Sequence, residues 1–494
     1  MKPTRITIFE GLPGSGKTSR MLSEMICGPG RYILAAPRTA LIEEHVSSLR
    51  SHAAQSNAQP TITSIHSDQD EAGPIKRRIA DAFRFLKDAQ HVILAITHEG
   101  LQSIDPAELE GWHVRIDETP DAVASGQIRA PVAARWFETL YHLIKVEGTK
   151  WCKVQAKTDA PSIGHFLRDD LAEQLAAFHK RVISVSGLYV DVGAWDEAFD
   201  RSKPIRWWSL WTPRDLAECA SVKIAASGYA SSLCALATDS LFPGEVEYSC
   251  EWIESPRSGQ PKVHIHYITG HRGSTEFWKN GDGRDCLNAV GLYLSKLHDL
   301  GFWSGNEVVR DRFELLLKGK QVSPRQAGTN AYRHLRSCAI IYSNKAQDAD
   351  SAILEVFGLT KDQIARAREI EDIQQFVMRG AIRNPDFDGL YDIYVYDLWQ
   401  AEAVRDFLED GGITGVTLLG IDEAGLMEFE RPKGGRKPVQ LDDRSKAERL
   451  AERRNKDAAR KRQARSIERL RREEAGTLRE PGRPPKKVTT LRAG

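Results

Sequence analysis

Gly11-Leu12-Pro13-Gly14-Ser15-Gly16-Lys17-Thr18 matches the phosphate-loop pattern G-x-x-x-x-G-K-[ST]. An apolar alternating segment at residues 5–10 precedes it and a helix-forming segment at 19–26 follows, which is the context that the motif requires. Backbone N–H groups of such a loop surround phosphates, Lys17 reaches the β- and γ-phosphates, and the Thr18 hydroxyl ligates Mg²⁺. The sequence therefore predicts a nucleoside triphosphate site, and a simple glycine turn is the alternative. The expected nucleotide-binding residues are Gly11, Pro13, Gly14, Ser15, Gly16, Lys17, Thr18 and Ser19.

The charge of the chain is unevenly distributed. The 494 residues are 41% hydrophobic and 28% charged, which is ordinary for a globular protein with two or three domains. Residues 431–494 contain 22 Lys and Arg against 9 Asp and Glu, which leaves 47 basic and 59 acidic residues in 1–430. The net charge of +1 hides this division. A basic tail on an acidic body favours binding to a polyanion.

Cysteine usage and hydropathy indicate a cytoplasmic protein. The seven cysteines are scattered and form no C-x-x-C pair, which argues for reduced thiols and against structural zinc. No apolar run approaches the roughly 18 residues that span a bilayer, and residues 1–5 lead directly into a strand-like segment rather than a secretory signal. We therefore expect no membrane association.

The pattern of elements predicts an α/β protein with a parallel, doubly wound sheet and implies two similar-sized α/β lobes. Strand-like segments are expected at 5–10, 31–36, 61–65, 91–96, 112–117, 221–226, 245–254, 262–269, 337–343 and 391–397. The expected domains are an ATP-binding lobe at 1–240 with a helix-rich insertion at 130–218, a second lobe at 241–430, and a basic helical or disordered tail at 431–494.

The sequence His113-Val114-Arg115-Ile116-Asp117-Glu118 provides the acids that an ATPase needs besides a phosphate loop. An alternating strand ends in two carboxylates, at the edge of a parallel sheet where ligands bind. Asp117 is expected to hold Mg²⁺ together with Thr18, and Glu118 to polarise the attacking water. A solvated helix cap is the alternative for this acidic pair.

A third segment, Gln375 to Arg383, contains two arginines four residues apart, Arg379 and Arg383. At that spacing they are expected on one face of a helix. Contributed by the second lobe, either arginine would stabilise the charge of the transferred γ-phosphoryl group. Gln375 of the same segment is also expected to belong to the catalytic site. The alternative is a pair of surface arginines in exposed ion pairs.

In this order the segments resemble the motifs of superfamily 2 helicases, the DEAD/DEAH-like nucleic-acid motors. Gly11–Thr18 resembles motif I, Asp117-Glu118-Thr119-Pro120 motif II, and Gln375 with Arg379 and Arg383 motif VI. Residues 35–41 resemble motif Ia, 96–101 the threonine-bearing element before motif II, 225–227 motif III and 326–332 motif V. The similarity covers about residues 6–397. Motif II reads D-E-T-P, and Arg383 stands eight residues after Gln375, so no subgroup is assigned.

The resemblance implies two RecA-like lobes with ATP hydrolysed between them, ATP and Mg²⁺ as ligands, and nucleic acid as partner. It also implies that residues of motif Ia, of the threonine-bearing element before motif II and of motif V touch the phosphate backbone of a bound strand. The residues implied for this contact are Pro37, Arg38, Thr39, Thr97, Gly328, Thr329 and Asn330.

Two further features of the sequence are the tryptophans of the insertion and a pair of histidines in the second lobe. The tryptophans of the insertion are expected to fill a core, with stacking on unpaired bases as the alternative. Trp207, Trp208 and Trp211 are the best candidates for exposure, because three tryptophans so close in sequence cannot all face one interior. His264 and His266 share one face of a strand, where we expect hydrogen-bonded imidazoles, because a metal site would need another acid or Cys in register and none is apparent.

These observations together predict a DNA helicase or translocase that hydrolyses ATP. Single-stranded or forked DNA is the favoured substrate, and replication or repair proteins are possible partners. A phosphate-loop kinase or toxin that acts on a small molecule, and a packaging-type or non-motor nucleic-acid-binding ATPase, remain as alternatives.

Overall fold

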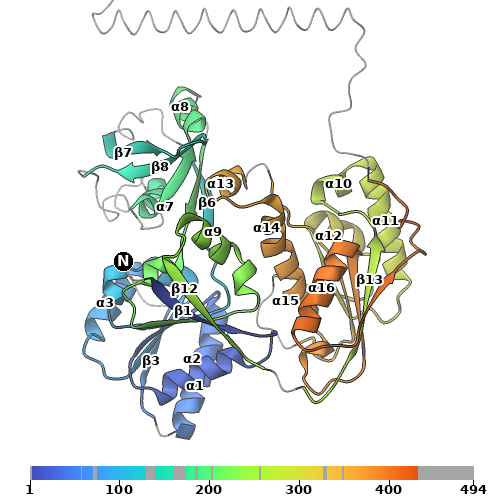
Figure 1. Cartoon of the computed structure of the whole chain (residues 1–494), viewed down its shortest axis with the longest axis horizontal. Coiled ribbons are helices and arrows are strands. Elements are labelled where there is room, and N and C mark those ends of the chain that lie inside the picture. The colour runs from blue at the N-terminus through green and yellow to red at the C-terminus, as the bar shows by residue number, and fades with distance from the viewer. Residues whose placement is uncertain are drawn as a thin grey trace, which may run out of the picture. The chain divides into compact units, whose positions relative to one another are not determined.

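The computed structural model describes residues 3–431 apart from 57, 70–74, 130–138, 159, 161–172, 184–186, 202–203, 255–256, 326–330 and 348–349. Met1–Glu430 form one compact unit (Figure 1). The expected tail lies outside the described residues except for Arg431. Among the helices of the described ranges, none combines the length and the apolar character needed to cross a bilayer.

The first lobe is built on a seven-stranded parallel sheet with the strand order β12-β1-β11-β5-β2-β4-β3. Its strands are β1 (Thr4–Glu10), β2 (Arg31–Ala36), β3 (Thr61–Ile65), β4 (Val92–Thr97), β5 (His113–Asp117), β11 (Ser221–Ala225) and β12 (Val246–Trp252). Its helices are α1 (Lys17–Cys27), α2 (Thr39–Ser56), α3 (Ile75–Phe85), α4 (His98–Leu101) and α9 (Leu233–Leu241). Because β12 pairs with β1, the sheet extends beyond the lobe boundary expected at residue 240.

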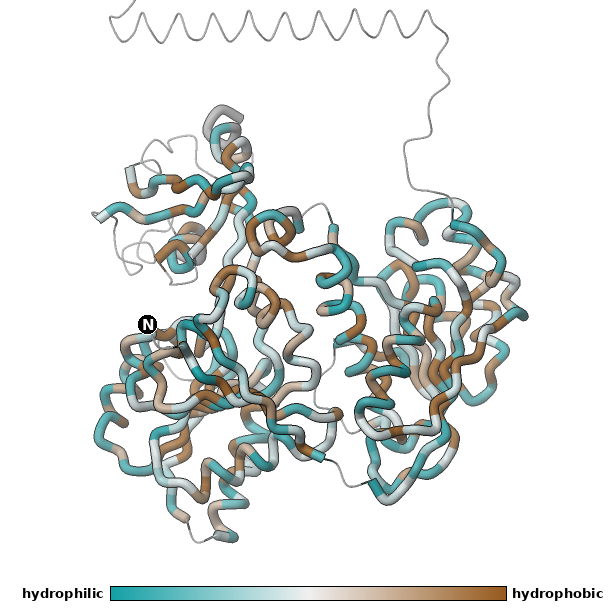
Figure 2. Tube along the Cα trace, viewed as in Figure 1, coloured by the Kyte–Doolittle hydropathy of each residue, from teal (hydrophilic) through white to brown (hydrophobic). Residues whose placement is uncertain are grey.

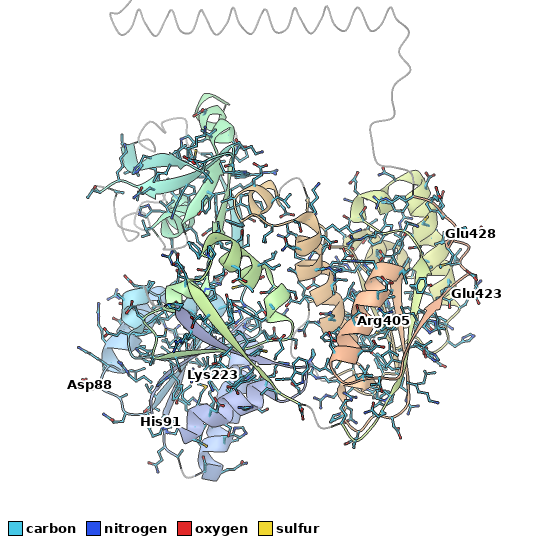
Figure 3. All side chains as sticks on the ribbon, viewed as in Figure 1. Asp88, His91, Lys223, Arg405, Glu423 and Glu428 are labelled. Atoms are coloured by element: carbon cyan, nitrogen blue, oxygen red, sulfur yellow. The ribbon has the colours of Figure 1, made fainter. Side chains whose placement is uncertain are left out.

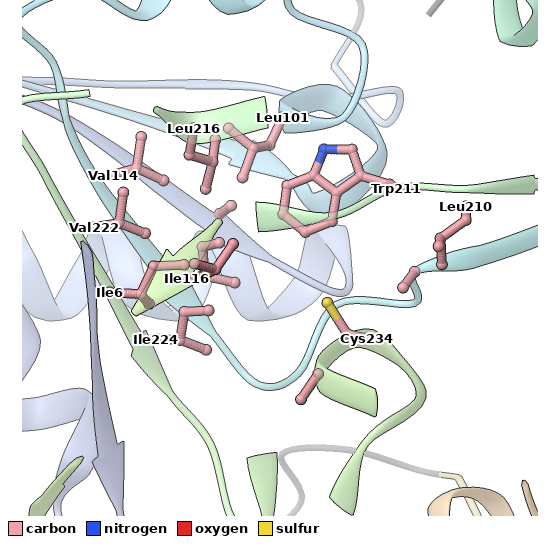
Figure 4. Packing of buried hydrophobic residues seen from close by; sticks show 14 of the residues in the cluster. Ile6, Leu101, Val114, Ile116, Leu210, Trp211, Leu216, Val222, Ile224 and Cys234 are labelled. Carbon is pink, nitrogen blue, oxygen red and sulfur yellow. The ribbon is translucent and has the colours of Figure 1, made fainter. Parts of the chain in front are cut away.

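Apolar side chains cover both faces of this sheet, as a buried parallel sheet requires. Helices α1 and α2 pack on one face, where Met21, Met25 and Val46 meet Phe9 and Leu34. On the other face, sheet residues such as Ile116 and Ile224 pack beside Trp211 and Cys234 (Figure 4). At the sheet surface, Lys223 of β11 (labelled in Figure 3) pairs with Glu24 of α1 at 2.8 Å and ties that helix to the sheet.

The segment between Asp117 and β11 differs from its expected helical character. Its described part contains a five-stranded antiparallel sheet with the order β6-β10-β9-β8-β7. Its elements are β6 (Val123–Arg129), β7 (Tyr141–Lys145), β8 (Trp151–Ala156), α7 (Glu173–Val182), β9 (Leu188–Asp191), α8 (Val192–Arg201) and β10 (Pro204–Leu210).

Neighbouring tryptophans of the insertion are buried in two different cores. Trp207 packs in the core of the antiparallel sheet, whereas Trp208 and Trp211 pack in the core of the first lobe. Successive residues of a strand point to opposite faces, so one strand can serve both cores. Because both faces of β10 are buried, its sequence lacks the alternation of polar and apolar residues that marks a half-exposed strand. The expectation that Trp207, Trp208 and Trp211 are exposed is therefore wrong, because all three are buried, whereas the core interpretation is confirmed for the other described tryptophans of the insertion, Trp151 and Trp195.

The second lobe is built on a six-stranded parallel sheet with the order β15-β14-β16-β17-β13-β18. Its strands are β13 (Lys262–Thr269), β14 (Phe302–Gly305), β15 (Lys320–Gln321), β16 (Ser337–Ile341), β17 (Leu390–Asp397) and β18 (Val416–Gly420). Its helices are α10 (Thr275–Lys279), α11 (Gly281–Ser295), α12 (Glu307–Phe313), α13 (Ser351–Glu355), α14 (Lys361–Ala365), α15 (Glu371–Val377) and α16 (Leu398–Asp410). Apolar residues follow its strands (Figure 2), and helices α15–α16 and α10–α12 bury its two faces in separate cores. The prediction of two RecA-like α/β lobes is confirmed.

Candidate nucleotide and nucleic-acid site

The phosphate loop joins the carboxyl end of β1 to the start of α1, as the sequence predicts. Gly11, Gly14 and Gly16 have φ values of 147°, 92° and 91°, a region that side chains with a Cβ rarely adopt. A Cβ on Gly11 would also lie 2.6 Å from the carbonyl oxygen of Ile253. The loop therefore needs glycine for its conformation, and it directs backbone N–H groups and the N-terminus of α1 toward one point.

Lys17 lies at the base of this loop and is 8% exposed. Its Nζ donates hydrogen bonds to the carbonyl oxygens of Gly11 at 2.6 Å and Leu12 at 2.9 Å, and to Ser227 Oγ at 3.0 Å. Ser227, from the segment that resembles motif III, also donates to the Gly11 carbonyl at 2.6 Å. Burial lowers the pKa of Lys17 to about 8, against the opposing attraction of Asp117 and Glu10.

The pKa of Lys17 leads to a prediction about nucleotide affinity. Binding of ADP without Mg²⁺ is expected to weaken as the pH rises through about 8, because Lys17 then loses the proton that attracts phosphate. Fluorescence titration with a labelled ADP in the presence of a chelator, from pH 6.5 to 9.5, measures this. Lys17→Arg is the matched control, since arginine stays protonated over that range. An affinity that stays constant across pH 8 in the wild type would contradict the assignment.

Asp117 and Thr18 meet beside the loop. Asp117 is the last residue of β5, which β11 separates from β1 in the sheet. Thr18 Oγ1 donates to Asp117 Oδ1 at 2.6 Å. A hydroxyl and a carboxylate oxygen are ligands that Mg²⁺ accepts, usually with several waters retained. The two side chains expected to hold Mg²⁺ are thus adjacent and fit that ion.

Glu118, the residue after Asp117, has a strained backbone conformation. Its φ of 65° makes it the one residue other than glycine with a positive φ in the described chain, and its N–H donates to the carbonyl of Ala225 at 2.9 Å. Such outliers cluster at functional sites, because the surrounding structure must impose them. Burial, followed by the charge of Asp117, raises the pKa of Glu118 to about 7. That value suits a group that accepts a proton near neutral pH.

Two histidines that the motif search missed hold Asp117 in place. His45 of α2 donates from Nε2 to Asp117 Oδ2 at 2.7 Å, and both side chains are less than 10% exposed. His98 of α4 donates from Nε2 to the backbone carbonyl of Asp117 at 2.9 Å. Because His45 occupies Oδ2, the other carboxylate oxygen stays directed at Thr18. A histidine 72 residues before the aspartate carries no local signal in the sequence.

Replacing His45 by alanine is expected to reduce nucleotide hydrolysis by about 10- to 100-fold, the effect of removing partners that orient a metal ligand. The Mg²⁺ concentration for half-maximal rate should rise as well, because Asp117 is then free to rotate. His45→Gln, whose amide can donate from a similar position, should restore part of both. Hydrolysis measured over a range of Mg²⁺ concentrations tests this, and an unchanged Mg²⁺ requirement in His45→Ala would remove the positioning role.

The second lobe places Arg383 against the phosphate loop. A Cβ added to Gly14 would lie 3.3 Å from Arg383 Cγ and 3.4 Å from its Nε. The Nε atom is buried and has no hydrogen-bond partner among the described residues. Arg383 also lowers the pKa of Lys17 through its charge, after the larger effect of burial. A positive group with unused hydrogen-bonding capacity thus faces the phosphate site from the opposite lobe.

Arg379 has a different position, and the expectation that both arginines share a helix face is wrong. Helix α15 ends at Val377, and Gly380 is extended before the short turn Ala381–Arg383. A Cβ on Gly380 would lie 2.2 Å from the Tyr391 hydroxyl, so the close approach of Tyr391 requires glycine there. Arg379 donates to the carbonyls of Ser323 at 2.7 Å and Pro324 at 2.9 Å.

The residues implied to contact nucleic acid are described in part. Arg38 precedes α2 and donates a hydrogen bond to the Arg325 carbonyl of the second lobe. Thr97 caps α4 by accepting from the N–H of Gly100 at 3.1 Å. Gly328, Thr329 and Asn330 lie outside the described residues.

One cavity of about 1550 Å³ connects these groups. The predicted site residues that line it are Pro13, Gly14, Gly16, Lys17, Thr18, Ser19, Pro37, Arg38, Thr39, Thr97, Asp117, Glu118, Gln375, Arg379 and Arg383. Gly11 and Ser15 belong to the same loop but do not line it. The cavity therefore joins motifs of both lobes, including segments separated by more than 350 residues in sequence.

Comparison with known proteins gives distant structural similarities. No family model and no curated protein matches the sequence. Similar solved structures include S. cerevisiae Dbp5 bound to RNA and ADP BeF3, with 8% identity, 85% of each chain covered and a TM-score of 0.33. A DEAD box protein from Methanococcus jannaschii has 9% identity, 85% and 88% coverage and a TM-score of 0.26. An arterivirus nonstructural protein 10 (helicase) has 10% identity, 80% and 61% coverage and a TM-score of 0.30. Two of these similar structures are described as a DEAD box protein and a helicase.

Proposed function

We propose that this chain is a nucleic-acid-dependent ATPase that acts as a helicase or translocase, with DNA as its substrate. One observation carries the proposal: Arg383 of the second lobe lies against Gly14 of the phosphate loop, in the cavity that Lys17, Asp117 and Glu118 also line. A nucleotide in that cavity would contact both lobes. Its hydrolysis can therefore change how the lobes are held together, which is what a motor requires.

The side chains divide the chemistry among them. Lys17 exchanges its carbonyl partners for phosphate oxygens, and Thr18 and Asp117 hold Mg²⁺. Glu118 accepts the proton of the attacking water, and Arg383 stabilises the charge that develops on the γ-phosphoryl group. ATP with Mg²⁺ supplies the phosphoryl group and its leaving group. Gln375, half-buried in the same cavity, assists in orienting the water.

We assign nucleic-acid contact to Pro37, Arg38, Thr39 and Thr97, which line the cavity. From the motif resemblance alone we also assign it to Gly328, Thr329 and Asn330, which lie outside the described residues. Arg38 supports this assignment, because its contact with the Arg325 carbonyl joins the first lobe to the turn that also holds Arg379. A strand bound there would act on both lobes. The basic segment 431–494 adds affinity through phosphates without reading sequence.

Hydrolysis rates with and without nucleic acid test the proposal. We expect single-stranded DNA to stimulate ATP hydrolysis more than single-stranded RNA of the same length does, and a forked duplex to be unwound when ATP is present. Stimulation without unwinding identifies a translocase. Absence of stimulation by either polymer would contradict the proposal and favour a phosphate-loop enzyme that acts on a small molecule.

A further inference from the structure

Three potential metal ligands meet at the amino ends of two neighbouring strands in the second lobe. His264 and His266 belong to β13, and Asp392 belongs to β17. The strands are parallel and His264 is paired in register with Asp392. The three side chains share the sheet face that carries Tyr394 and, farther along, the apolar core beneath α10–α12. The sequence expectation that no acid lies in register with the histidines is therefore wrong, because β17 supplies one 126 residues later.

Their nitrogen atoms converge on one carboxylate oxygen. His266 Nε2 lies 2.8 Å and His264 Nδ1 lies 3.6 Å from Asp392 Oδ1. One ligand atom from each residue lies within 4.8 Å of the other two. The ring of His266 stacks on Tyr394 with a centroid distance of 4.5 Å and an interplanar angle of 10°, which fixes the direction of its nitrogens.

This spacing fits a transition-metal ion better than it fits a simple hydrogen-bonded pair. A hydrogen bond from His266 to Asp392 accounts for one imidazole, but it leaves the approach of the second to the same oxygen at 3.6 Å without a function. Ligands about 2.0–2.2 Å from a tetrahedral Zn²⁺ lie roughly 3.3 Å apart. The two nitrogen–oxygen distances, 2.8 Å and 3.6 Å, fall on either side of that value.

We propose that His264, His266 and Asp392 form a binding site for a divalent transition-metal ion such as Zn²⁺. Two imidazoles and one carboxylate are a ligand set that such ions accept. The side chains are 36%, 16% and 26% exposed, so the ion enters from solvent and water completes its coordination. The site joins β13 to β17 at the strand ends opposite to those that carry the nucleotide site of a parallel sheet, and it is independent of the proposed ATPase function.

Metal binding to the full chain tests the site. The chelator-treated protein is titrated with Zn²⁺ by calorimetry and with Co²⁺ by visible absorption. We expect the wild type to bind one equivalent without the thiolate charge-transfer band that cysteine ligation would give. His264→Ala, His266→Ala and Asp392→Asn should each weaken binding at least about 10-fold, the effect found even for outer partners of metal ligands. Thermal unfolding confirms that each variant is folded.

His298→Ala is the matched control. His298 is an exposed histidine of the same lobe, outside the cluster, and its removal should leave the affinity unchanged. Equal Zn²⁺ affinity in the wild type and in Asp392→Asn, or a Co²⁺ spectrum dominated by thiolate, would overturn the proposal. Because the readout is metal binding, it gives the same answer whether or not the chain hydrolyses ATP.

Discussion

Replacement of Arg383 by alanine should lower the rate of ATP hydrolysis by about 10³–10⁵-fold, the effect of an arginine that stabilises the phosphoryl-transfer transition state. The structure favours this arginine because its side chain lies against Gly14 and its buried Nε has no partner in the described chain. Nucleotide binding should change far less than the rate, since the charge that Arg383 stabilises develops during the reaction. Single-turnover hydrolysis and nucleotide titration measure the two effects separately.

Two variants sharpen that experiment. Arg383→Lys keeps the charge but lacks the planar guanidinium, so it should recover only part of the rate. Arg405→Ala changes a partly exposed arginine of the same lobe that pairs with Asp406 and should leave the rate unchanged. Arg379→Ala should reduce stability, because Arg379 holds the carbonyls of Ser323 and Pro324. A near-normal rate in Arg383→Ala together with a collapse in a folded Arg379→Ala would transfer the role to Arg379.

Replacement of Glu118 by glutamine should leave nucleotide bound but reduce hydrolysis by about 10²–10⁴-fold, the contribution of a general base. The raised pKa and the positive φ of Glu118 both indicate a side chain held for this task rather than for stability. Glutamine keeps the size of the side chain and removes its basicity. Filter binding of labelled ATP and steady-state hydrolysis with single-stranded DNA measure the separation.

Glu423→Gln provides the control for this substitution, since Glu423 is exposed in the second lobe (Figure 3). Wild-type hydrolysis in Glu118→Gln would show that another group accepts the proton. Loss of nucleotide binding in the same variant would instead indicate that the Glu118 carboxylate is needed to hold the nucleotide.

Local patterns in the sequence predicted the strands of the first sheet, three of the six strands of the second sheet, and the contiguous motifs of the site, but not β14, β15 or β18. Strands with apolar residues on both faces, such as β2 and β4, stand out as short apolar runs. The phosphate loop and Asp117-Glu118 are contiguous motifs at strand ends. The antiparallel sheet of the insertion was not predicted, because β10 buries both faces against two cores and shows no polar alternation.

Long-range contacts explain the remaining differences. At the end of α15, the Tyr391 hydroxyl donates a hydrogen bond to the carbonyl of Val377 at 2.9 Å, a contact that helix propensity does not reveal. His45 and Asp392 acquire their partners from strands 72 and 126 residues away. Such pairs arise from the register of parallel strands and from the path of a helix over a sheet, which a single sequence does not encode locally.

Segment Ala352–Ile364 of the second lobe has a consequence for how the molecule can be divided. Ile353, Phe357 and Ile364 belong to the same apolar cluster as Ile116 and Trp208 of the nucleotide-binding lobe. Phe357 meets Tyr189 edge to face with a centroid distance of 5.8 Å, and Glu355 accepts from Trp151 Nε1 at 3.1 Å. A fragment that stops after β12 would therefore expose an apolar patch to water and tend to self-associate. A truncated protein that contains only the nucleotide-binding lobe therefore has to include residues 352–364 to remain monomeric in solution.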